Sequence, residues 1–330
     1  MKIQLRHKYE DIISLANLLL AWQEFILGKK NKPDVQMFVR NLMDNIISLH
    51  QDLTNHTYRH GGYESFFVND PKRRHIHKAS VRDRLLHHAI YCILYPFFDH
   101  TFLPDSFSCR LNKGTHKAIN RFRDLANKVS QNNTATCWVL KGDIRKFFAS
   151  IDHKILLNIL GEYIPDKKIV GLLKNIIGSF GTDPGTGLPL GNLTSQLFSN
   201  VYLNVFDHWV KHKLKAKHYI RYADDFVILS RDKDWLLSVI PEIQSFLSSR
   251  LKLTLHPNKI ILKTLASGAD FLGWVNFPRH RVLRHTTRRR MFVRLHNNFS
   301  FEAIQSYLGF LSHGSSYRLT SVVKRFTKIA

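Results

Sequence analysis

The sequence has few acidic residues, few cysteines and no long hydrophobic run. Its 49 lysines and arginines oppose only 25 acidic residues, which gives a formal net charge of +24 and a pI of about 10.1. A surface this basic favours a polyanionic partner, and nucleic acid is the commonest one. No apolar run approaches the roughly 20 residues that span a bilayer, and the start, MKIQLRHKYED, has no apolar signal region. We therefore expect a cytoplasmic protein without a membrane partner.

The 3 cysteines, Cys92, Cys109 and Cys137, have no close C-x-x-C spacing. This number and spacing favour neither a disulfide framework nor a zinc site, so we expect reduced, mostly buried thiols. Hydrophobic residues make up 44% of the chain and aromatic residues 12%. That is enough to bury a core, which argues against disorder of the whole chain.

Helical and strand patterns alternate along the chain. Such alternation, combined with strand pairs joined by short turns, indicates an α+β sheet domain rather than an α/β barrel. The composition changes after Pro278, where 7 arginines lie before Leu295. The patterns predict helices over 11–27, 34–53, 81–98, 154–163, 193–214 and 234–250, and strands within 61–77, 137–143, 219–230, 251–262 and 270–277.

Two adjacent carboxylates, Asp224 and Asp225, interrupt the apolar strand pattern YIRYADDFVILS. A buried carboxylate costs several kcal/mol unless it is paired or bound to a metal. An Asp-Asp pair at a tight hairpin tip is the structural alternative. A third carboxylate, Asp143, ends another apolar strand pattern. Brought together, the three would form an oxygen-only pocket suited to Mg²⁺, and two ions about 4 Å apart promote nucleotidyl transfer.

Seven segments resemble motifs of reverse transcriptases, in the order of that family. Two of them, RHIHKASVRDRLLHHAI and FSCRLNKGTHKAINR, resemble the fingers motifs, and Tyr222–Asp225 resembles the catalytic tetrapeptide of the palm. The resemblance covers roughly residues 70–280. It implies an α+β right-hand polymerase with fingers, a palm with an antiparallel sheet and a short helical thumb. The palm-like segments are VLKGDIRKFFASIDH, GLPLGNLTSQLFSNVYLNVFDH, RYADDFVILS, LKLTLHPNKIIL and DFLGW.

The same resemblance implies a division of the chain into four parts. We expect an N-terminal helical extension and the start of the fingers over 1–70, fingers over 71–137, a palm with interspersed fingers helices over 138–277, and a basic thumb over 278–330. Apolar positions at helical spacing after residue 300 favour a helical thumb over a disordered basic tail.

The resemblance also assigns the catalytic centre. Asp143 and Asp224 resemble the two metal ligands, Asp225 completes the site, and Ile144 belongs to the expected metal set. The implied cofactor is Mg²⁺, as two ions that Mn²⁺ can replace. Lys259 matches the lysine that protonates departing pyrophosphate, with a solvated loop lysine as the alternative.

Further positions match residues that bind substrates. Arg110 resembles the fingers arginine on the triphosphate, since a planar guanidinium suits phosphate oxygens. Phe148 resembles the aromatic residue under the incoming sugar, with core packing as the alternative. Gly273 resembles the primer grip, with a plain hairpin glycine as the alternative. The remaining candidates are Lys78, Arg82, Arg84, Gly191 and Gln196 for phosphate, template or nucleotide, and Arg288, Arg289 and Arg290 for the nucleic-acid backbone.

The segment LGNLTSQ separates this chain from most of the family. Most relatives have Gln-Gly at its start and Ser-Pro at its end, whereas this chain has Leu190-Gly191 and Ser195-Gln196. The departure resembles the reverse transcriptases of diversity-generating retroelements, which carry out mutagenic retrohoming. Leu190 and Gln196 would then be fidelity residues that loosen selection over template adenine, because glutamine frees a backbone that proline would fix.

This subgroup implies particular partners. They are a structured template RNA, cDNA, deoxynucleoside triphosphates and a small basic helical accessory protein. Because the chain stops at Ala330, we expect no maturase, endonuclease or RNase H segment. Two alternatives stay open: another small prokaryotic reverse transcriptase of retron, phage-defence or group II intron type, and an RNA-binding protein with the same fold but no turnover.

Overall fold

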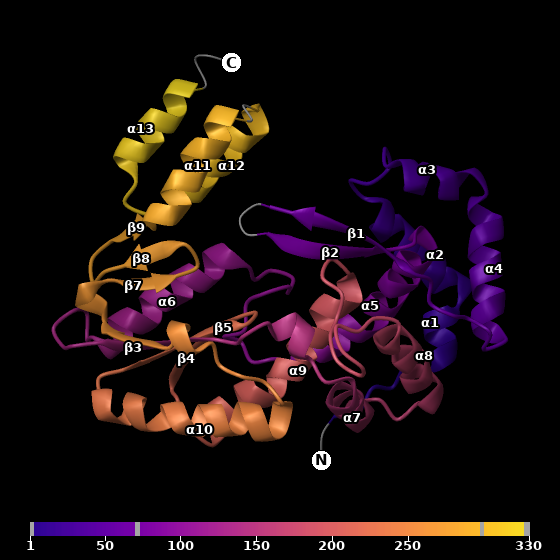
Figure 1. Cartoon of the computed structure of the whole chain (residues 1–330), viewed down its shortest axis with the longest axis horizontal. Helices are drawn as coiled ribbons and strands as arrows, with labels where there is room; N and C mark the ends of the chain where they lie inside the picture. Colours follow the sequence, from indigo (N-terminus) through magenta and orange to yellow (C-terminus); the bar gives the residue numbers. More distant parts are fainter. Residues whose placement is uncertain (1–2, 70–72, 298–299, 327–330) are drawn as a thin grey trace. The chain divides into compact units, whose positions relative to one another are not determined.

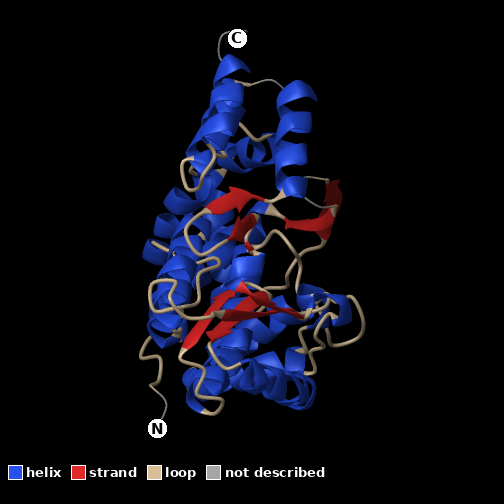
Figure 2. Cartoon of the chain, turned by 90° about the vertical axis from the view of Figure 1, so that its left-hand side faces the viewer, coloured by secondary structure: helices blue, strands red, loops and turns tan. Residues whose placement is uncertain are grey.

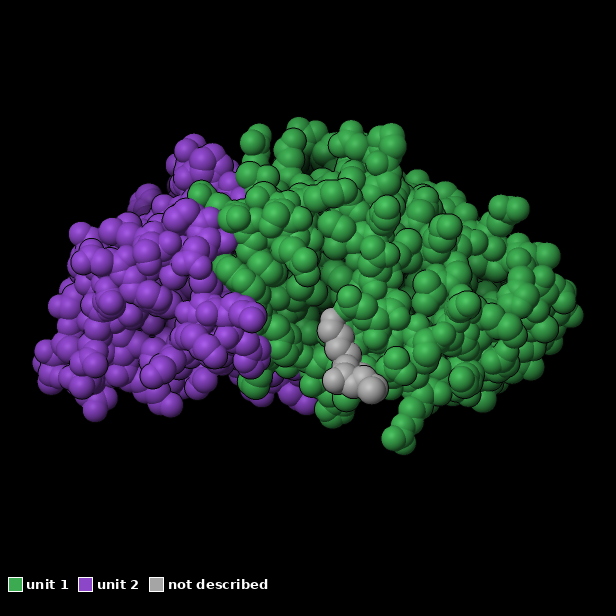
Figure 3. All heavy atoms as spheres, turned by 90° about the horizontal axis from the view of Figure 1, so that it is seen from below, with its two compact units in different colours: residues 1–104, 144–209, 244–254 green, residues 105–143, 210–243, 255–330 purple. Residues whose placement is uncertain are grey.

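The structure of the chain is a computed structural model that describes residues 3–69, 73–297 and 300–326. The chain divides into two compact units (Figure 3). The first comprises Met1–Pro104, Ile144–Trp209 and Gln244–Thr254. The second comprises Asp105–Asp143, Val210–Ile243 and Leu255–Ala330. Each unit therefore combines segments that are distant in sequence.

The first unit is largely helical. Helix α2 packs along α5, and the buried side chains of Ile12, Leu18 and Phe25 contribute to its core (Figure 1). Its hairpin consists of strands β1 and β2, which pair antiparallel from Tyr63 opposite Ala79 to Val68 opposite Arg74. The elements of its first segment are α1 (Tyr9–Ile13), α2 (Leu15–Ile26), α3 (Pro33–Arg40), α4 (Leu42–Thr54), β1 (Tyr63–Val68), β2 (Arg74–Ala79) and α5 (Val81–Thr101).

Two of the predicted helices are interrupted. The helix expected over 11–27 breaks at Ser14, whose side chain accepts the Asn17 N–H and starts α2 as a cap. The helix expected over 34–53 breaks at Asn41, whose φ of −126° and ψ of 46° are not helical. Both predictions were wrong about continuity, because apolar spacing persists across a local cap. The expected strand pair around 61–77 is confirmed, and its Asp-Pro turn lies outside the described residues.

The second segment of this unit contains η1 (Phe147–Ser150), α7 (His153–Tyr163) and α8 (Lys167–Gly178). The expected cap is confirmed, since Asp152 accepts the Ile155 N–H at 2.9 Å and starts α7. Helices α9 (Leu193–His212) and α10 (Lys233–Leu251) each supply residues to both units.

The second unit contains a four-stranded sheet with strand order β4-β5-β3-β6, in which every pairing is antiparallel. Helix α6 (Thr115–Val129) packs on β4 and β5 and buries Ile119 and Phe122 (Figure 1). The strand expected over 251–262 is realised only at its end, because Pro257–Lys259 form a short 3₁₀ turn. The strands are β3 (Trp138–Asp143), β4 (His218–Tyr222), β5 (Asp225–Ser230) and β6 (Ile261–Thr264).

A second sheet and a group of helices complete this unit. The three short strands β7 (Ala269–Phe271), β8 (Trp274–Asn276) and β9 (Arg281–Leu283) pair in sequence order. Three helices follow, and they lie side by side beyond this sheet (Figures 1 and 2). They are α11 (His285–Asn297), α12 (Phe301–Leu311) and α13 (Tyr317–Phe326), and their inward side chains join the core around Trp274.

Two compositional expectations can be compared with the structure. Within its described part, no helix has both the length and the apolar character that a bilayer crossing needs. All three cysteines are free, but only Cys137 is buried, whereas Cys92 is half-buried and Cys109 is exposed. The expectation of mostly buried thiols was therefore wrong for Cys109.

Candidate active site

The carboxylates Asp143, Asp224 and Asp225 come together in the second unit. Strand β3 runs antiparallel to β5 in a register that sets Asp143 opposite Asp225. Strands β4 and β5 form a hairpin in which Tyr222 pairs with Asp225, so Ala223 and Asp224 make its two-residue turn. The backbone carbonyl of Asp143 accepts the His256 N–H at 2.8 Å, which ties the end of β3 to the following loop.

The turn that carries Asp224 is held in an uncommon conformation. Ala223 has a φ of 53°, in the left-handed region that costs a residue with a Cβ about 1–2 kcal/mol. The buried guanidinium of Arg221 donates to the Ala223 carbonyl at 3.1 Å and to the Ser106 hydroxyl at 3.0 Å. Arg221 therefore braces the turn from inside the unit. The sequence alone does not identify Arg221 as a site residue, and its one signal is a charge within the apolar run YIRY.

Two lysines lie against the carboxylates. Lys259 Nζ donates to Asp143 Oδ1 at 2.9 Å, and Lys141 Nζ lies 3.7 Å from Asp225 Oδ1. The sequence motifs predict a role for Lys259 but not for Lys141. Its signal was the strand period, because a lysine two residues before Asp143 faces the same side of the sheet.

The site has a surplus of negative charge in partly buried surroundings. Burial raises the pKa of Asp224 to about 6, and repulsion from Asp225 and Asp143 adds to this increase. Burial also raises the pKa of Asp225, with a contribution from Asp143 that Lys141 and Lys259 oppose. A cation placed among these oxygens would relieve the repulsion.

The three carboxylates fit the expected Mg²⁺ in their chemistry, since Mg²⁺ prefers oxygen ligands. The described side chains include no group of three His, Cys, Asp or Glu that is already arranged to hold a metal ion. Burial and mutual repulsion raise the pKa values of Asp224 and Asp225, and a bound cation would lower them. Ile144 follows Asp143 directly and is buried, and its part in the site stays a prediction.

Arg110 is linked to the catalytic turn through Ser106. The Arg110 guanidinium donates to the Ser106 carbonyl at 3.0 Å, and the Ser106 hydroxyl accepts from Arg221. The loop also pairs with β4, since the Phe107 N–H donates to the Arg221 carbonyl at 3.0 Å. The structure thus places the predicted triphosphate residue within two hydrogen bonds of the side chain that braces the turn.

The predicted primer grip and backbone arginines lie farther along this unit. Gly273 has a φ of 86° in the turn between β7 and β8, where Leu272 also has a positive φ. Two positive φ values are the requirement of this tight hairpin turn, so glycine is needed for its backbone. The carbonyl of Gly273 accepts the Arg284 N–H at 3.0 Å. Arg288 and Arg289 are exposed on α11, and Arg290 is half-buried beside them.

The fidelity candidates lie in the first unit, at the start of α9. The Leu190 carbonyl accepts the His77 N–H of β2 at 2.9 Å. Gly191 has a φ of 104°, and a Cβ there would lie 2.8 Å from Ile76 Cγ2. Gln196 is half-buried in the first turn of α9. The segment is therefore fixed against the hairpin strand β2.

Phe148 is hydrogen-bonded to Leu188, two residues before the fidelity candidate Leu190. Its carbonyl accepts the Leu188 N–H at 2.8 Å, and its ring lies 5.4 Å from that of Phe147. Its side chain is half-buried. Phe148 and the fidelity segment therefore belong to one local network within the first unit.

Three basic candidates of this unit are held in ion pairs. Lys78 Nζ lies 2.8 Å from Asp34 and 3.2 Å from Glu64, and its hydrogen bond with Asp34 raises its pKa. Arg84 also pairs with Asp34, and Arg82 pairs with Asp52. Their charges are thus largely compensated by protein carboxylates. The partners Asp34 and Asp52 are distant in sequence, so the motifs alone do not indicate these pairs.

Comparison with known proteins supports the resemblance that the motifs indicate. The family described as "Reverse transcriptase (RNA-dependent DNA polymerase)" matches residues 69–275. Protein YkfC of Escherichia coli (strain K12) is 26% identical over 255 residues, covering 66% of this chain and 65% of YkfC. This chain is therefore compared with somewhat less than two thirds of that relative.

Two intron-encoded proteins match a similar share of this chain. The group II intron-encoded protein LtrA of Lactococcus lactis subsp. cremoris is 21% identical over 277 residues, which cover 62% of this chain and 45% of LtrA. The putative COX1/OXI3 intron 2 protein of Saccharomyces cerevisiae is 21% identical over 276 residues, 65% of this chain and 30% of that protein. The mixed helices and antiparallel sheets agree with the right-hand polymerase fold, and the match over 69–275 shows that the chain belongs to the reverse transcriptase family.

Proposed function

We propose that this chain is an RNA-directed DNA polymerase that adds deoxynucleotides to a primer on an RNA template. The observation that carries the proposal is the register that sets Asp143 opposite Asp225, beside the turn of Asp224, in a member of the reverse transcriptase family. Asp143, Ile144, Asp224 and Asp225 would hold Mg²⁺. When bound, the metal supplies activation of the primer hydroxyl and stabilisation of the leaving oxygen.

The chain's own side chains orient the reactants and move the proton. Lys259 carries its ammonium group next to Asp143, where it can donate a proton to departing pyrophosphate. Lys141 lies beside Asp225 and offsets part of its charge. Arg110, fixed by Ser106, would bind the triphosphate. These roles assign proton donation to Lys259 and substrate orientation to Arg110.

The basic chain is proposed to bind template RNA, the growing cDNA and deoxynucleoside triphosphates. Arg288, Arg289 and Arg290 would contact the nucleic-acid backbone, which gives affinity without sequence readout. We further propose a small basic helical accessory protein as a partner. If that protein supplies part of the RNA binding, the isolated chain should extend primers weakly, and its addition should increase the extension rate.

A primer-extension assay tests the polymerase proposal. Wild-type protein should incorporate deoxynucleotides on an RNA template in the presence of Mg²⁺, and Asp224→Ala should lose this activity. Asp44→Ala, which removes an exposed carboxylate on α4, is the matched control and should keep it. Equal incorporation by wild type and Asp224→Ala would refute the polymerase assignment of this site. Absence of incorporation by both would favour a non-catalytic RNA-binding protein.

We also propose the finer assignment to diversity-generating retroelements, with misincorporation at template adenines. Leu190 and Gln196 support it, since they stand where most relatives have glutamine and proline, and the Leu190 carbonyl accepts the His77 N–H of β2. Leu190→Gln combined with Gln196→Pro should lower the adenine error rate. Unchanged errors at adenine in the double variant would rule out this role for the two residues.

A second candidate is a group II intron-like or other small prokaryotic reverse transcriptase. The similarity to LtrA and to the yeast intron protein favours it. Sequencing of cDNA made from a defined RNA distinguishes the two candidates. Errors concentrated at template adenines select the diversity-generating assignment, whereas accurate, branched or untemplated products select the second.

A further inference from the structure

A cavity of about 680 Å³ lies within the second unit, away from the carboxylates. Its walls come from α6, from the turn between β8 and β9, and from the connection between α12 and α13. Leu265 lines it and donates its N–H to the carbonyl of Cys137. Cys137 directly precedes β3, and Asp143 is the last residue of the same strand. At about 3.3 Å per strand residue, this places the cavity roughly 20 Å from the catalytic carboxylates. It is therefore a separate site.

A buried cation that has no carboxylate partner among the described residues forms part of the wall. Arg281 is 8% exposed and donates to the carbonyls of Ile119, at 3.0 Å, and His313. Its third partner is the side-chain oxygen of Asn120, at 2.7 Å. All three acceptors are neutral, so the positive charge of Arg281 is solvated by dipoles but not neutralised. Such a charge in a partly closed cavity attracts anions.

Neighbouring basic groups increase the positive potential. Burial lowers the pKa of Arg281, and the charge of Arg123 lowers it further, opposed by Asp124. Burial also lowers the pKa of His313, with added effects of His116 and Arg281, so His313 is the neutral group of this wall and the positive charge comes from the arginines. Arg123 and Arg279 line the cavity and are exposed, and neither forms an ion pair with a described residue. The cavity thus contains repelling cations that an anion would compensate.

An aromatic pair borders the same cavity. The rings of Phe277 and His280 stack with centroids 4.9 Å apart and an interplanar angle of 14°. The Phe277 N–H donates to the His280 carbonyl at 2.8 Å, so the turn itself holds the two rings together. His280 is exposed and Phe277 half-buried. A flat aromatic surface next to arginines is the combination with which proteins stack a base and bind its phosphate.

We propose that this cavity binds a nucleotide, with the phosphate at Arg123, Arg279 and Arg281 and the base against Phe277 and His280. The volume falls within the range of about 300–1,000 Å³ that small-molecule sites occupy. The nucleotide can be free or can belong to a single-stranded RNA, because both present the same phosphate and base. The site goes beyond nucleotidyl transfer at the carboxylates and does not depend on it.

Calorimetric titration of the full chain with adenosine monophosphate tests the proposal. The titration is run in EDTA, so that metal-dependent binding at the carboxylates does not contribute. Adenosine monophosphate should bind more tightly than inorganic phosphate or adenosine alone. Arg123→Gln and Arg279→Gln should each weaken binding by about tenfold or more, because each removes a charge-assisted contact. Hexa-adenylate, added as a competitor, distinguishes an RNA strand from a free nucleotide as the natural source.

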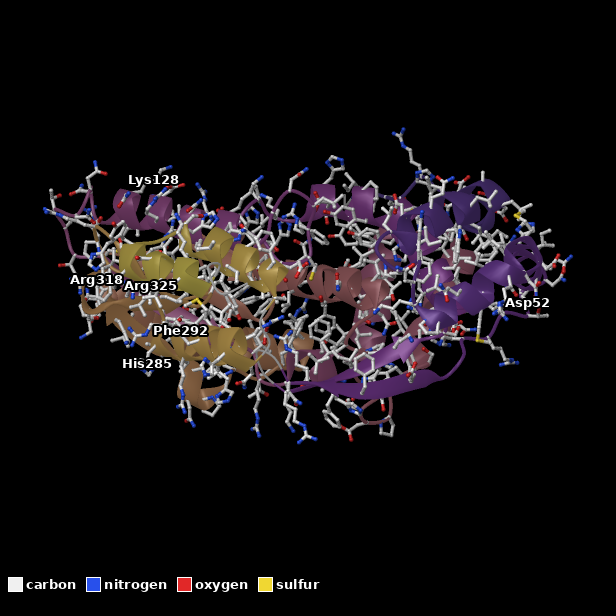
Figure 4. All side chains as sticks on the ribbon, turned by 90° about the horizontal axis from the view of Figure 1, so that it is seen from above. Asp52, Lys128, His285, Phe292, Arg318 and Arg325 are labelled. Atoms are coloured by element: carbon white, nitrogen blue, oxygen red, sulfur yellow. The ribbon has the colours of Figure 1, made fainter. Side chains whose placement is uncertain are left out.

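Arg325→Gln is the matched control, since Arg325, which Figure 4 labels on α13, is exposed and is not among the residues that line the cavity. It should leave the affinity for adenosine monophosphate unchanged. An equal loss in Arg325→Gln and Arg123→Gln would show general attraction to a basic surface and would overturn the proposal. Absence of binding to the wild type, or equal affinity for phosphate and adenosine monophosphate, would also overturn it.

Discussion

Replacement of Arg221 by methionine should slow catalysis without abolishing the fold. Arg221→Met keeps most of the side-chain volume but removes the hydrogen bonds to the Ala223 carbonyl, at 3.1 Å, and to the Ser106 hydroxyl, at 3.0 Å. A hydrogen bond to a charged group contributes roughly 1.5–3 kcal/mol. The left-handed conformation of Ala223 costs about 1–2 kcal/mol, and in the variant no Arg221 hydrogen bond supports it.

The expected magnitude follows from the population of the braced turn. If about 2 kcal/mol of support is lost, the equilibrium constant that holds Asp224 in place falls about thirtyfold, and the fraction of molecules with Asp224 in place falls by at most that factor. We therefore expect kcat for primer extension to fall by up to about thirtyfold, with KM for the deoxynucleotide within about twofold of the wild type. Overall stability should change less, because removal of a buried charge also removes its desolvation cost.

Steady-state primer extension checks this prediction, with thermal unfolding measured in parallel. Arg221→Lys should resemble Arg221→Met, since an ammonium group cannot reproduce the forked geometry of guanidinium. Arg110→Met is the contrasting variant, because loss of a triphosphate contact should raise KM. An unchanged kcat in both Arg221 variants, or a loss explained by unfolded protein alone, would refute the positioning role.

Three other outcomes are expected. Gly191→Ala should lower the free energy of unfolding by about 1–3 kcal/mol more than Gly185→Ala, because both glycines have positive φ but only Gly191 would place a Cβ against Ile76. Urea titration of the two variants measures the difference. An equal loss of unfolding free energy in both would contradict the clash with Ile76. Burial lowers the pKa of His87 to about 3, below its unfolded value of about 6.5. Unfolding therefore takes up a proton between these pH values, and this group should reduce stability by about 1.4 kcal/mol per pH unit as the pH falls through that window. Urea titrations at several pH values give the slope of the free energy of unfolding against pH, which should be smaller by this amount in His87→Leu than in the wild type. An identical slope in the two proteins would exclude the effect. Removal of divalent metal by EDTA should abolish primer extension, and added Mg²⁺ or Mn²⁺ should restore it; extension in EDTA would contradict the metal requirement.

The meeting of Asp143 with Asp225 could be anticipated from the sequence. Each lies at the end of an apolar strand pattern, and buried carboxylates need compensation. The contributions of Lys141 and Arg221 could not be read in the same way, because an isolated charge in a strand has no visible partner in the sequence. The contact of Lys141 with Asp225 depends on the register of β3 and β5, and the contact of Arg221 with the Ala223 carbonyl depends on the hairpin turn.

Lys78 and Arg84 illustrate the opposite case. Both lie in segments that resemble fingers motifs, and both were selected as candidates for phosphate. Folding brings Asp34, which is distant in sequence, against both of them. The charges of Lys78 and Arg84 are therefore already paired within the protein, and that pairing depends on long-range packing.

The sequence by itself determined the local features of this protein: its basic charge, its alternating strands and helices, and the apolar runs that end in Asp143, Asp224 and Asp225. These follow from side-chain period and composition, which are properties of neighbouring residues. The tertiary structure decided the register of the carboxylates, the brace from Arg221 and the cavity around Arg281. Each of these joins residues far apart in the chain, and such contacts are fixed only when distant segments pack together.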